Sequence, residues 1–220
     1  MYEALLFDLD GVLVDSERAA YDIWKAYLKK HESYALSERT YASIAGLPSA
    51  SFRSLMETTL PGDMEALLSH WVKRMDVLAF SGRIEIKAGY GRLQAFLRDF
   101  EGKKAIVTSN GGRWLPAYLK KLQAREYFDA VIDGKMVERH KPAPDPYLMA
   151  CEKLGVAPAR CLAVEDSPSG IMAASIAGMA VIRMVDFEGF PPELEKLCKA
   201  QVYDLNGVVD FLLKSRDADL

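Results

Sequence analysis

The chain has 220 residues, half of them hydrophobic and 27% charged, which is the composition of an ordinary globular protein. With 28 lysine and arginine residues against 31 aspartate and glutamate residues, its net charge of −3 offers no basic excess for nucleic acid or an anionic membrane. We therefore expect neither as a partner. The longest uncharged run is broken by proline and glycine and is too short to span a bilayer.

The cysteines and the first residues indicate the compartment. Cys151, Cys161 and Cys198 have neither the spacing of a disulfide framework nor that of a zinc site. We expect reduced, mostly buried thiols, as in a cytoplasmic protein. The opening MYEALLFDLD contains three acidic residues, so we expect no signal peptide.

Short apolar segments alternate with helical patterns along most of the chain. Strands are predicted at 4–7, 105–107, 130–132, 161–164 and 180–182, with a further short strand at 201–203. Apolar stripes with helical spacing predict helices at 90–100, 114–122 and 205–213. This alternation is typical of an α/β fold, and we expect a Rossmann-like, doubly wound parallel sheet covered by helices.

One long interval interrupts the alternation. Between residues 8 and 104 no segment is typical of a strand, whereas apolar stripes at 20–28 and 64–78 predict helices. A single crossover helix needs far fewer residues than this interval contains. The interval therefore indicates an all-helical insertion.

We place this inserted domain at residues 16–86, and the sheet domain at 1–15 and 87–220. Its two connections are expected near 14–17 and 85–88. Insertions of this kind are tolerated where their two ends lie close together at a surface.

Three of the predicted strands end in polar clusters, which are Asp8-Leu9-Asp10-Gly11, Thr108-Ser109-Asn110-Gly111 and Glu165-Asp166-Ser167. In an open parallel sheet, ligands bind outside the carboxyl ends of the strands, so we expect these clusters to meet. Several carboxylates gathered there repel one another and are costly to bury. A divalent cation removes this cost, and oxygen ligands suit Mg²⁺.

The same groups can act on a phosphate. A carboxylate such as Asp8 can serve as a nucleophile, and a second one, Asp10, can donate and accept a proton. Thr108 and the backbone N–H groups after it, expected at the start of a helix, can hold phosphate oxygens. Lys141, in the proline-rich loop His140-Lys141-Pro142-Ala143-Pro144, can neutralise developing charge.

Together these clusters resemble the four motifs of the haloacid dehalogenase superfamily, in the family's order. The segment from Asp8 to Ser16 resembles the first motif and Val107-Thr108-Ser109-Asn110 the second. Lys141-Pro142 resembles the third, and Val164-Glu165-Asp166-Ser167 the fourth. The resemblance covers essentially the whole chain, and the helical insertion looks like the four-helix cap of the β-phosphoglucomutase-like branch.

The resemblance implies a role for each site residue. Asp8 is the expected nucleophile, forming an aspartyl-phosphate, and Asp10 the general acid and base, whose backbone carbonyl also reaches Mg²⁺. The expected phosphate-binding residues are Thr108, Ser109, Asn110 and Lys141. The expected metal ligands are Asp8, Asp10, Glu165 and Asp166, with Glu165 either a direct ligand or a group behind the ligands.

The implied activity is Mg²⁺-dependent hydrolysis of a small phosphorylated metabolite, such as a sugar phosphate or a sugar-acid phosphate. Dehalogenation is not expected, because haloacid dehalogenases proper lack an acid at the position of Asp10. A β-phosphoglucomutase-type isomerase is the alternative. Those enzymes carry a histidine where this chain has Ala20, and basic residues where it has Ala45 and Ser49, a difference that favours the phosphatase.

Substrate specificity is expected to depend on the cap. The loop at Gly46 and the side chain of Arg53 are the candidate residues. The expected partner is a small phosphate ester, and the expected oligomeric state is a monomer.

Overall fold

The computed structural model describes residues 2–45 and 49–217, without the side chains of 49–51 and 217. The described strands form one parallel sheet in the order β3-β2-β1-β4-β5-β6. Its strands are β1 (Ala4–Phe7), β2 (Lys103–Val107), β3 (Ala130–Ile132), β4 (Cys161–Glu165), β5 (Ala180–Met184) and β6 (Ala200–Val202). Every predicted strand is present, and the α/β, Rossmann-like prediction is confirmed.

Successive side chains of β1 point to opposite faces of the sheet. Both sets are apolar, and helices cover both faces. Leu5 and Phe7 pack with the core under α5 (Tyr90–Asp99) and α11 (Leu205–Asp217). Ala4 and Leu6 face the opposite core, under the helices α8 (Asp145–Leu154) and α9 (Pro168–Ile176). The remaining helical segments beside the sheet are α6 (Leu115–Lys121), α7 (Ala124–Tyr127), the 3₁₀ turn at Pro158–Arg160 and α10 (Pro192–Glu195).

The chain order reverses at β1, which lies between β2 and β4. In doubly wound sheets this switch point opens a crevice at the carboxyl ends of the strands, where ligands bind. Asp8 directly follows β1, and Glu165 ends β4. The topology therefore brings these two acids together although 157 positions separate them (165 − 8).

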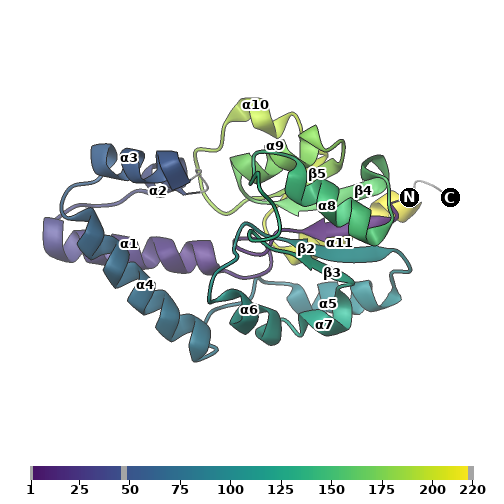
Figure 1. Cartoon of the computed structure of the whole chain (residues 1–220), viewed down its shortest axis with the longest axis horizontal. Coiled ribbons are helices and arrows are strands. Elements are labelled where there is room, and N and C mark those ends of the chain that lie inside the picture. Colours follow the sequence, from purple (N-terminus) through teal and green to yellow (C-terminus); the bar gives the residue numbers. More distant parts are fainter. Residues whose placement is uncertain (1, 46–48, 218–220) are drawn as a thin grey trace.

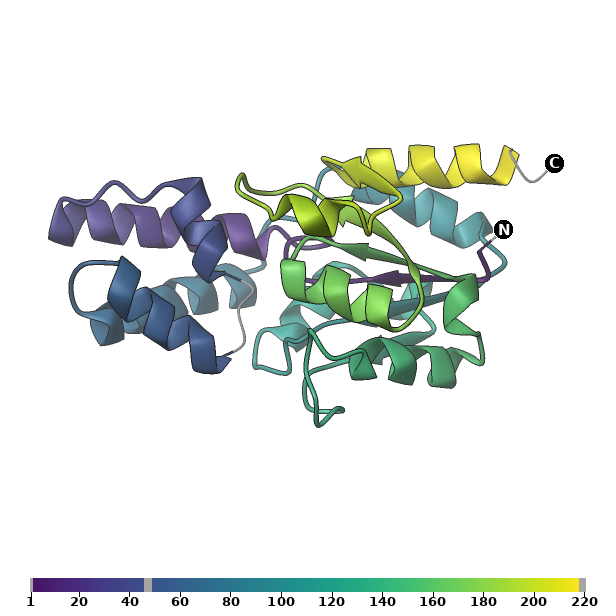
Figure 2. The ribbon, with the colours of Figure 1, turned by 90° about the horizontal axis from the view of Figure 1, so that it is seen from above.

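The inserted segment consists of four helices in the part that the structure describes: α1 (Ser16–Glu32), α2 (Glu38–Ile44), α3 (Ser49–Thr59) and α4 (Met64–Phe80). These helices lie together beyond one end of the sheet (Figure 1, Figure 2). They share a hydrophobic cluster of their own, built around Trp24, Leu28, Ile44, Met56 and Leu67. None of the described helices has the length and apolar character needed to span a bilayer.

The two connections between the sheet and the four helices run side by side. Val14 forms an antiparallel bridge with Ile86. The Asp15 backbone N–H donates to the Glu85 carbonyl at 2.9 Å, and the Lys87 N–H to the Leu13 carbonyl at 3.0 Å. These contacts support the proposal that residues 16–86 are an inserted domain entered and left at one place.

The segment after β2 differs from its prediction. The helix predicted at 114–122 is present as α6, but it begins at Leu115, so Thr108 and its neighbours lie in a loop and not at the expected helix start. The Asn110 side-chain carbonyl accepts the Gly112 N–H at 2.9 Å, which closes a local turn. Gly111 and Gly112 are poor helix formers, and this turn delays the helix.

Candidate active site

A cavity of about 950 Å³ lies between the carboxyl ends of the strands and the cap helices. Most of the predicted site residues line the side formed by the strand ends, which we call the floor. The opposite side, the cap side, is formed by residues of α1, α2, α3 and α4. Of the predicted residues, those that line it are Asp8, Asp10, Thr108, Ser109, Asn110, Lys141 and Asp166. Glu165 lies below the floor and is fully buried.

Lys141 is the buried cation of the site. Its ammonium donates to Asp8 Oδ1 at 2.6 Å, to Glu165 Oε1 at 2.5 Å and to the Val107 carbonyl at 2.9 Å. All three N–H groups thus have acceptors. Burial alone would lower the pKa of Lys141, but the two carboxylates raise it above its ordinary value, so the lysine stays charged.

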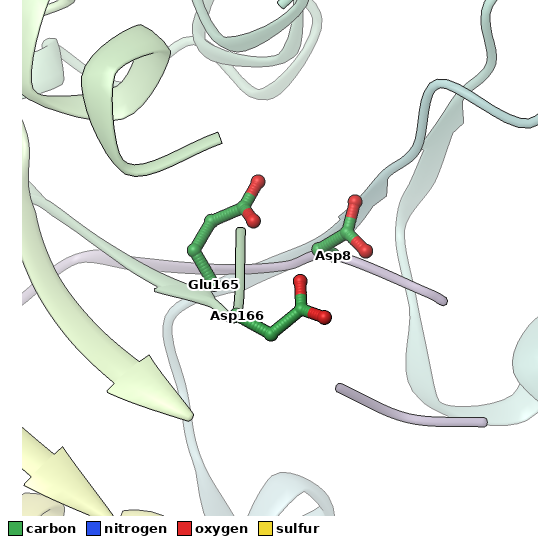
Figure 3. A group of neighbouring side chains, drawn as sticks. All are labelled: Asp8, Glu165 and Asp166. Atoms are coloured by element: carbon green, nitrogen blue, oxygen red, sulfur yellow. The ribbon is translucent and has the colours of Figure 1, made fainter. Parts of the chain in front are cut away.

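The carboxylates of Asp8, Glu165 and Asp166 lie close enough to share a metal ion. One oxygen from each lies within 4.8 Å of the others. Figure 3 shows the three side chains gathered at the ends of their two strands. Burial raises the pKa of both Asp8 and Asp166, and the neighbouring acids raise it further. Lys141 offsets only part of this negative charge, so the cluster fits a divalent cation.

Glu165 differs from the other two acids in its surroundings. Its Oε1 accepts from Lys141 and, at 2.6 Å, from the Tyr147 hydroxyl. By contrast, no described residue donates a hydrogen bond to the Asp166 carboxylate. Asp8 and Asp166 therefore have oxygens available for a metal, whereas Glu165 is held by the protein behind them.

Two glycines make room for these acids. A Cβ on Gly11, whose φ is +80°, would lie 1.9 Å from Asp166 Oδ2. A Cβ on Gly170, in the first turn of α9, would lie 2.1 Å from the Glu165 carboxyl atoms. The close approach of backbone to carboxylate thus requires glycine at both positions.

The Asp10 carboxylate is not part of the cluster formed by Asp8, Glu165 and Asp166. Its Oδ1 accepts from the Ser16 hydroxyl at 2.6 Å and its Oδ2 from the Asn110 amide at 3.3 Å. Burial raises the pKa of Asp10, and the hydrogen bonds from Ser16 and Asn110 oppose the shift. Among the four predicted metal ligands, its side chain is the one outside the cluster of carboxylates.

The loop after β2 provides hydrogen-bonding groups at the floor. Thr108 is buried, and its hydroxyl accepts the Asn110 backbone N–H at 2.9 Å. Ser109 is exposed at the cavity. Asn110 connects this loop to Asp10, so the second motif also orients the first.

Two residues of the site were not among those predicted from the sequence. Ser16 begins α1 yet holds Asp10, and Tyr147 in α8 holds Glu165. Ser16 is the last residue of the first motif, but the motif assigned it no role. Tyr147 reaches Glu165 through packing of α8 under the sheet, which no spacing in the sequence reveals.

The sequence named Arg53 and the loop at Gly46 as candidates for substrate specificity. Arg53 is exposed and pairs with Glu65 of α4 at 2.5 Å, and it is not among the residues that line the cavity. The structure therefore does not bring Arg53 to the cavity, because its guanidinium pairs with an acid on the neighbouring helix. The Gly46 loop lies outside the described residues.

The fold and the site define an α/β enzyme with an acidic, metal-compatible centre beneath a helical cover. The chain belongs to the haloacid dehalogenase-like hydrolases, whose family model matches residues 5–184. It is 31% identical to a phosphorylated carbohydrates phosphatase of Thermotoga maritima, over 80% of this chain and 82% of that protein. It is 28% identical to a β-phosphoglucomutase of Bacillus subtilis, over 82% of each chain.

The solved structures agree with this assignment. The structure of CbbY from Rhodobacter sphaeroides in complex with phosphate matches with a TM-score of 0.71 and 25% identity. The match covers 93% of this chain and 95% of that one, so both the sheet and the helical insertion are included. The predicted family is confirmed.

Proposed function

We propose that this protein is a Mg²⁺-dependent phosphatase that hydrolyses a small phosphorylated metabolite through an aspartyl-phosphate on Asp8. The observation that carries the proposal is the arrangement of Asp8 at the switch point. Its carboxylate lies between a buried lysine and a metal-compatible acid, at the floor of the cavity. Phosphatases among its relatives support the same reaction.

Asp8 is the proposed nucleophile. One carboxylate oxygen attacks phosphorus, the bond from phosphorus to the ester oxygen breaks, and the alcohol leaves. The Lys141 ammonium, 2.6 Å from Oδ1, opposes the rise that burial causes in the pKa of Asp8 and so favours the ionised carboxylate. Mg²⁺, held by Asp8 and Asp166 with the Asp10 carbonyl, would offset the negative charge that otherwise repels a phosphate dianion.

Asp10 is the proposed general acid and base. Burial raises its pKa, which favours a proton on this carboxyl that can pass to the leaving oxygen. In the second step Asp10 takes a proton from the water that attacks the aspartyl-phosphate. Inorganic phosphate then leaves and Asp8 is regenerated. Ser16 and Asn110 hold the carboxyl in place through both steps.

The remaining phosphate oxygens are assigned to the loop after β2. The Thr108 and Ser109 hydroxyls, the Asn110 side chain and the Lys141 ammonium line the same part of the cavity. Together they can donate hydrogen bonds to the oxygens of the phosphoryl group while it is transferred. This assignment completes the proposed phosphate-binding set.

The second candidate function is that of a sugar-phosphate mutase, favoured by the similarity to a β-phosphoglucomutase. A mutase must hold a second phosphate at the cap end. Ala20 and Ala45 line this end of the cavity, at the positions where the resemblance places a histidine and a basic residue. Neutral residues there favour the phosphatase.

The proposed nucleophile is tested by replacing one oxygen. Asp8→Asn should lower phosphate release from p-nitrophenyl phosphate by roughly four orders of magnitude, because the amide cannot form the acyl phosphate. Release is measured with Mg²⁺ present, and a coupled assay for glucose 6-phosphate formed from β-glucose 1-phosphate separates the mutase. Near-normal hydrolysis by the folded variant would refute the assignment.

A further inference from the structure

The cap side of the cavity has no basic residue in the described part of the chain. Residues from all four cap helices line it, and they are neutral except for Glu17. The sequence between Ala45 and Phe52, Gly-Leu-Pro-Ser-Ala-Ser, contains no charged residue. The described residues on this side of the cavity therefore offer no cation to an anionic group of a substrate.

The basic residues of the core are engaged elsewhere. Lys141 and its neighbour His140 belong to the loop at the floor. Arg183 is buried on β5, where it donates to Glu195 at 2.6 Å and stacks over the Phe190 ring at 3.8 Å. Arg183 thus belongs to the core side of the cavity, and its guanidinium is already paired with Glu195.

Glu17 adds a negative charge to the cap side. Its carboxyl accepts the Tyr41 hydroxyl at 2.8 Å, and no described lysine or arginine forms an ion pair with it. Asp186 also lines the cavity, but Lys87 pairs with it at 3.0 Å. An anionic group of a substrate would be repelled by Glu17, because no described cation neutralises this carboxylate. A hydroxyl group could instead donate a hydrogen bond to it.

Aromatic rings also line this part of the cavity, among them three from the cap helices and one, Trp114, from the start of α6 in the core. We call Trp24, Phe52, Trp71 and Trp114 the aromatic wall. Trp24 lies 6.0 Å from Phe52 and 6.3 Å from Trp71, and Trp71 lies 5.6 Å from Trp114, between ring centroids. The indole N–H groups of Trp24 and Trp71 have no acceptor among the described residues. These indole nitrogens are buried, so the aromatic wall presents mainly ring carbon to the cavity, a surface that suits the uncharged part of a ligand better than an anion.

We propose that the cap side of this cavity selects phosphate monoesters whose alcohol is uncharged and carries hydroxyl groups. Esters with a carboxylate or a second phosphate on that alcohol are rejected. The inference rests on the proposed function, since it names the substrate class of the same site. Of the two classes that the sequence left open, it favours a sugar or polyol phosphate over a sugar-acid phosphate.

The test compares esters that differ in one charge. Glycerol 3-phosphate is matched with 3-phosphoglycerate, and glucose 6-phosphate with 6-phosphogluconate and with glucose 1,6-bisphosphate. Each is assayed as an inhibitor of p-nitrophenyl phosphate hydrolysis, so the result does not depend on turnover. At about pH 8, above the pKa of about 7 to which burial raises Glu17, the anionic members should bind about tenfold more weakly.

Two variants connect the discrimination to this side of the cavity. Glu17→Gln should reduce the difference within each pair, because it removes the uncompensated charge. Glu65→Gln, which changes an exposed carboxyl of α4 outside the cavity, should leave the difference unchanged. Equal or tighter binding of the anionic members to the parent protein would overturn the inference. Hydrolysis that survives in Asp8→Asn would instead overturn the proposed function.

Discussion

At the scale of single residues, the site depends on pairing one buried cation with several acids. Lys141 and Glu165 are both buried, and each would be costly to bury without the other. Tyr147 supplies the second hydrogen bond to Glu165 Oε1, from below the sheet. The lysine and the acid follow from the motifs, whereas the tyrosine is a consequence of packing alone.

Tyr147→Phe tests this support. Removing the hydroxyl leaves Glu165 Oε1 with one donor fewer, so the free energy of unfolding should fall by about 1–3 kcal/mol. Affinity for Mg²⁺ should fall by about tenfold or more, as for other groups that orient a metal ligand. Urea unfolding and a Mg²⁺ titration of activity measure the two effects.

Tyr118→Phe is the matched control. Tyr118 is equally buried, but its hydroxyl has no partner among the described residues. Its removal should leave stability within about 0.5 kcal/mol or raise it, because no hydrogen bond is lost. A loss in Tyr118→Phe as large as in Tyr147→Phe would contradict the role given to the bond with Glu165.

At the scale of elements, the strand ends and the helix starts set the distances in the site. β1 and β4 pair in register, so Asp8 and Glu165 emerge side by side. The start of α9 then passes directly over Glu165, because Gly170 has no side chain to keep them apart. A motif places an acid at the end of a strand, but the pairing of strands decides which acids meet.

Gly170→Ala should disturb this arrangement. The added Cβ would lie 2.1 Å from the Glu165 carboxyl atoms, so the acid must move away from Lys141 and Tyr147. We expect a loss of about 1–3 kcal/mol in the free energy of unfolding, with reduced activity. Thermal unfolding and phosphate release measure both.

Gly91→Ala provides the comparison within another helix. A Cβ on Gly91, in α5, meets no atom within 4 Å. The free energy of unfolding should therefore rise by about 0.5–1 kcal/mol, the difference in helix propensity. If Gly170→Ala were equally stabilising, the close approach to Glu165 would not constrain this position.

At the scale of the whole molecule, the cap joins the core through two paired segments beside the active site. Lys87 lies at this junction and pairs with Asp15 at 2.7 Å and with Asp186 at 3.0 Å. Ser16, at the first turn of the cap, holds Asp10 of the core. A displacement of the cap at this junction would therefore also change the surroundings of the proposed general acid.

The acid cluster also makes the stability of the whole protein depend on metal and pH. In the metal-free protein, burial raises the pKa values of Asp8, Asp10 and Asp166 above those of the unfolded chain. The folded state then binds protons more readily, so this contribution to stability is greatest at low pH and is lost as pH rises through the raised pKa values. Mg²⁺ competes with these protons.

We expect the increase in melting temperature on adding Mg²⁺ to be larger near pH 8 than near pH 6. Differential scanning fluorimetry at both pH values measures this increase. Asp166→Asn should remove most of it, whereas the exposed variant Glu65→Gln should retain it. An increase that is independent of pH would argue against metal binding at these carboxylates.

The sequence by itself determined the strands, the helical insertion and the acids at the strand ends. Apolar periodicity and motif spacing are local properties, and local properties suffice for these features. It also identified Asp8, Asp10 and Lys141 as residues that meet in one site. The loop after β2 was less predictable, because the turn at Asn110 competes with helix formation there.

Only the tertiary structure decided what surrounds those residues. Tyr147 below Glu165 and the aromatic wall both depend on elements that are far apart in the chain and pack together only in the folded protein. Arg53 is an example of the opposite kind. The sequence suggested that it contacts substrate, but in the structure its guanidinium pairs with Glu65. Such contacts depend on which faces of the helices and strands pack together. That packing is determined by burial of the hydrophobic core as a whole.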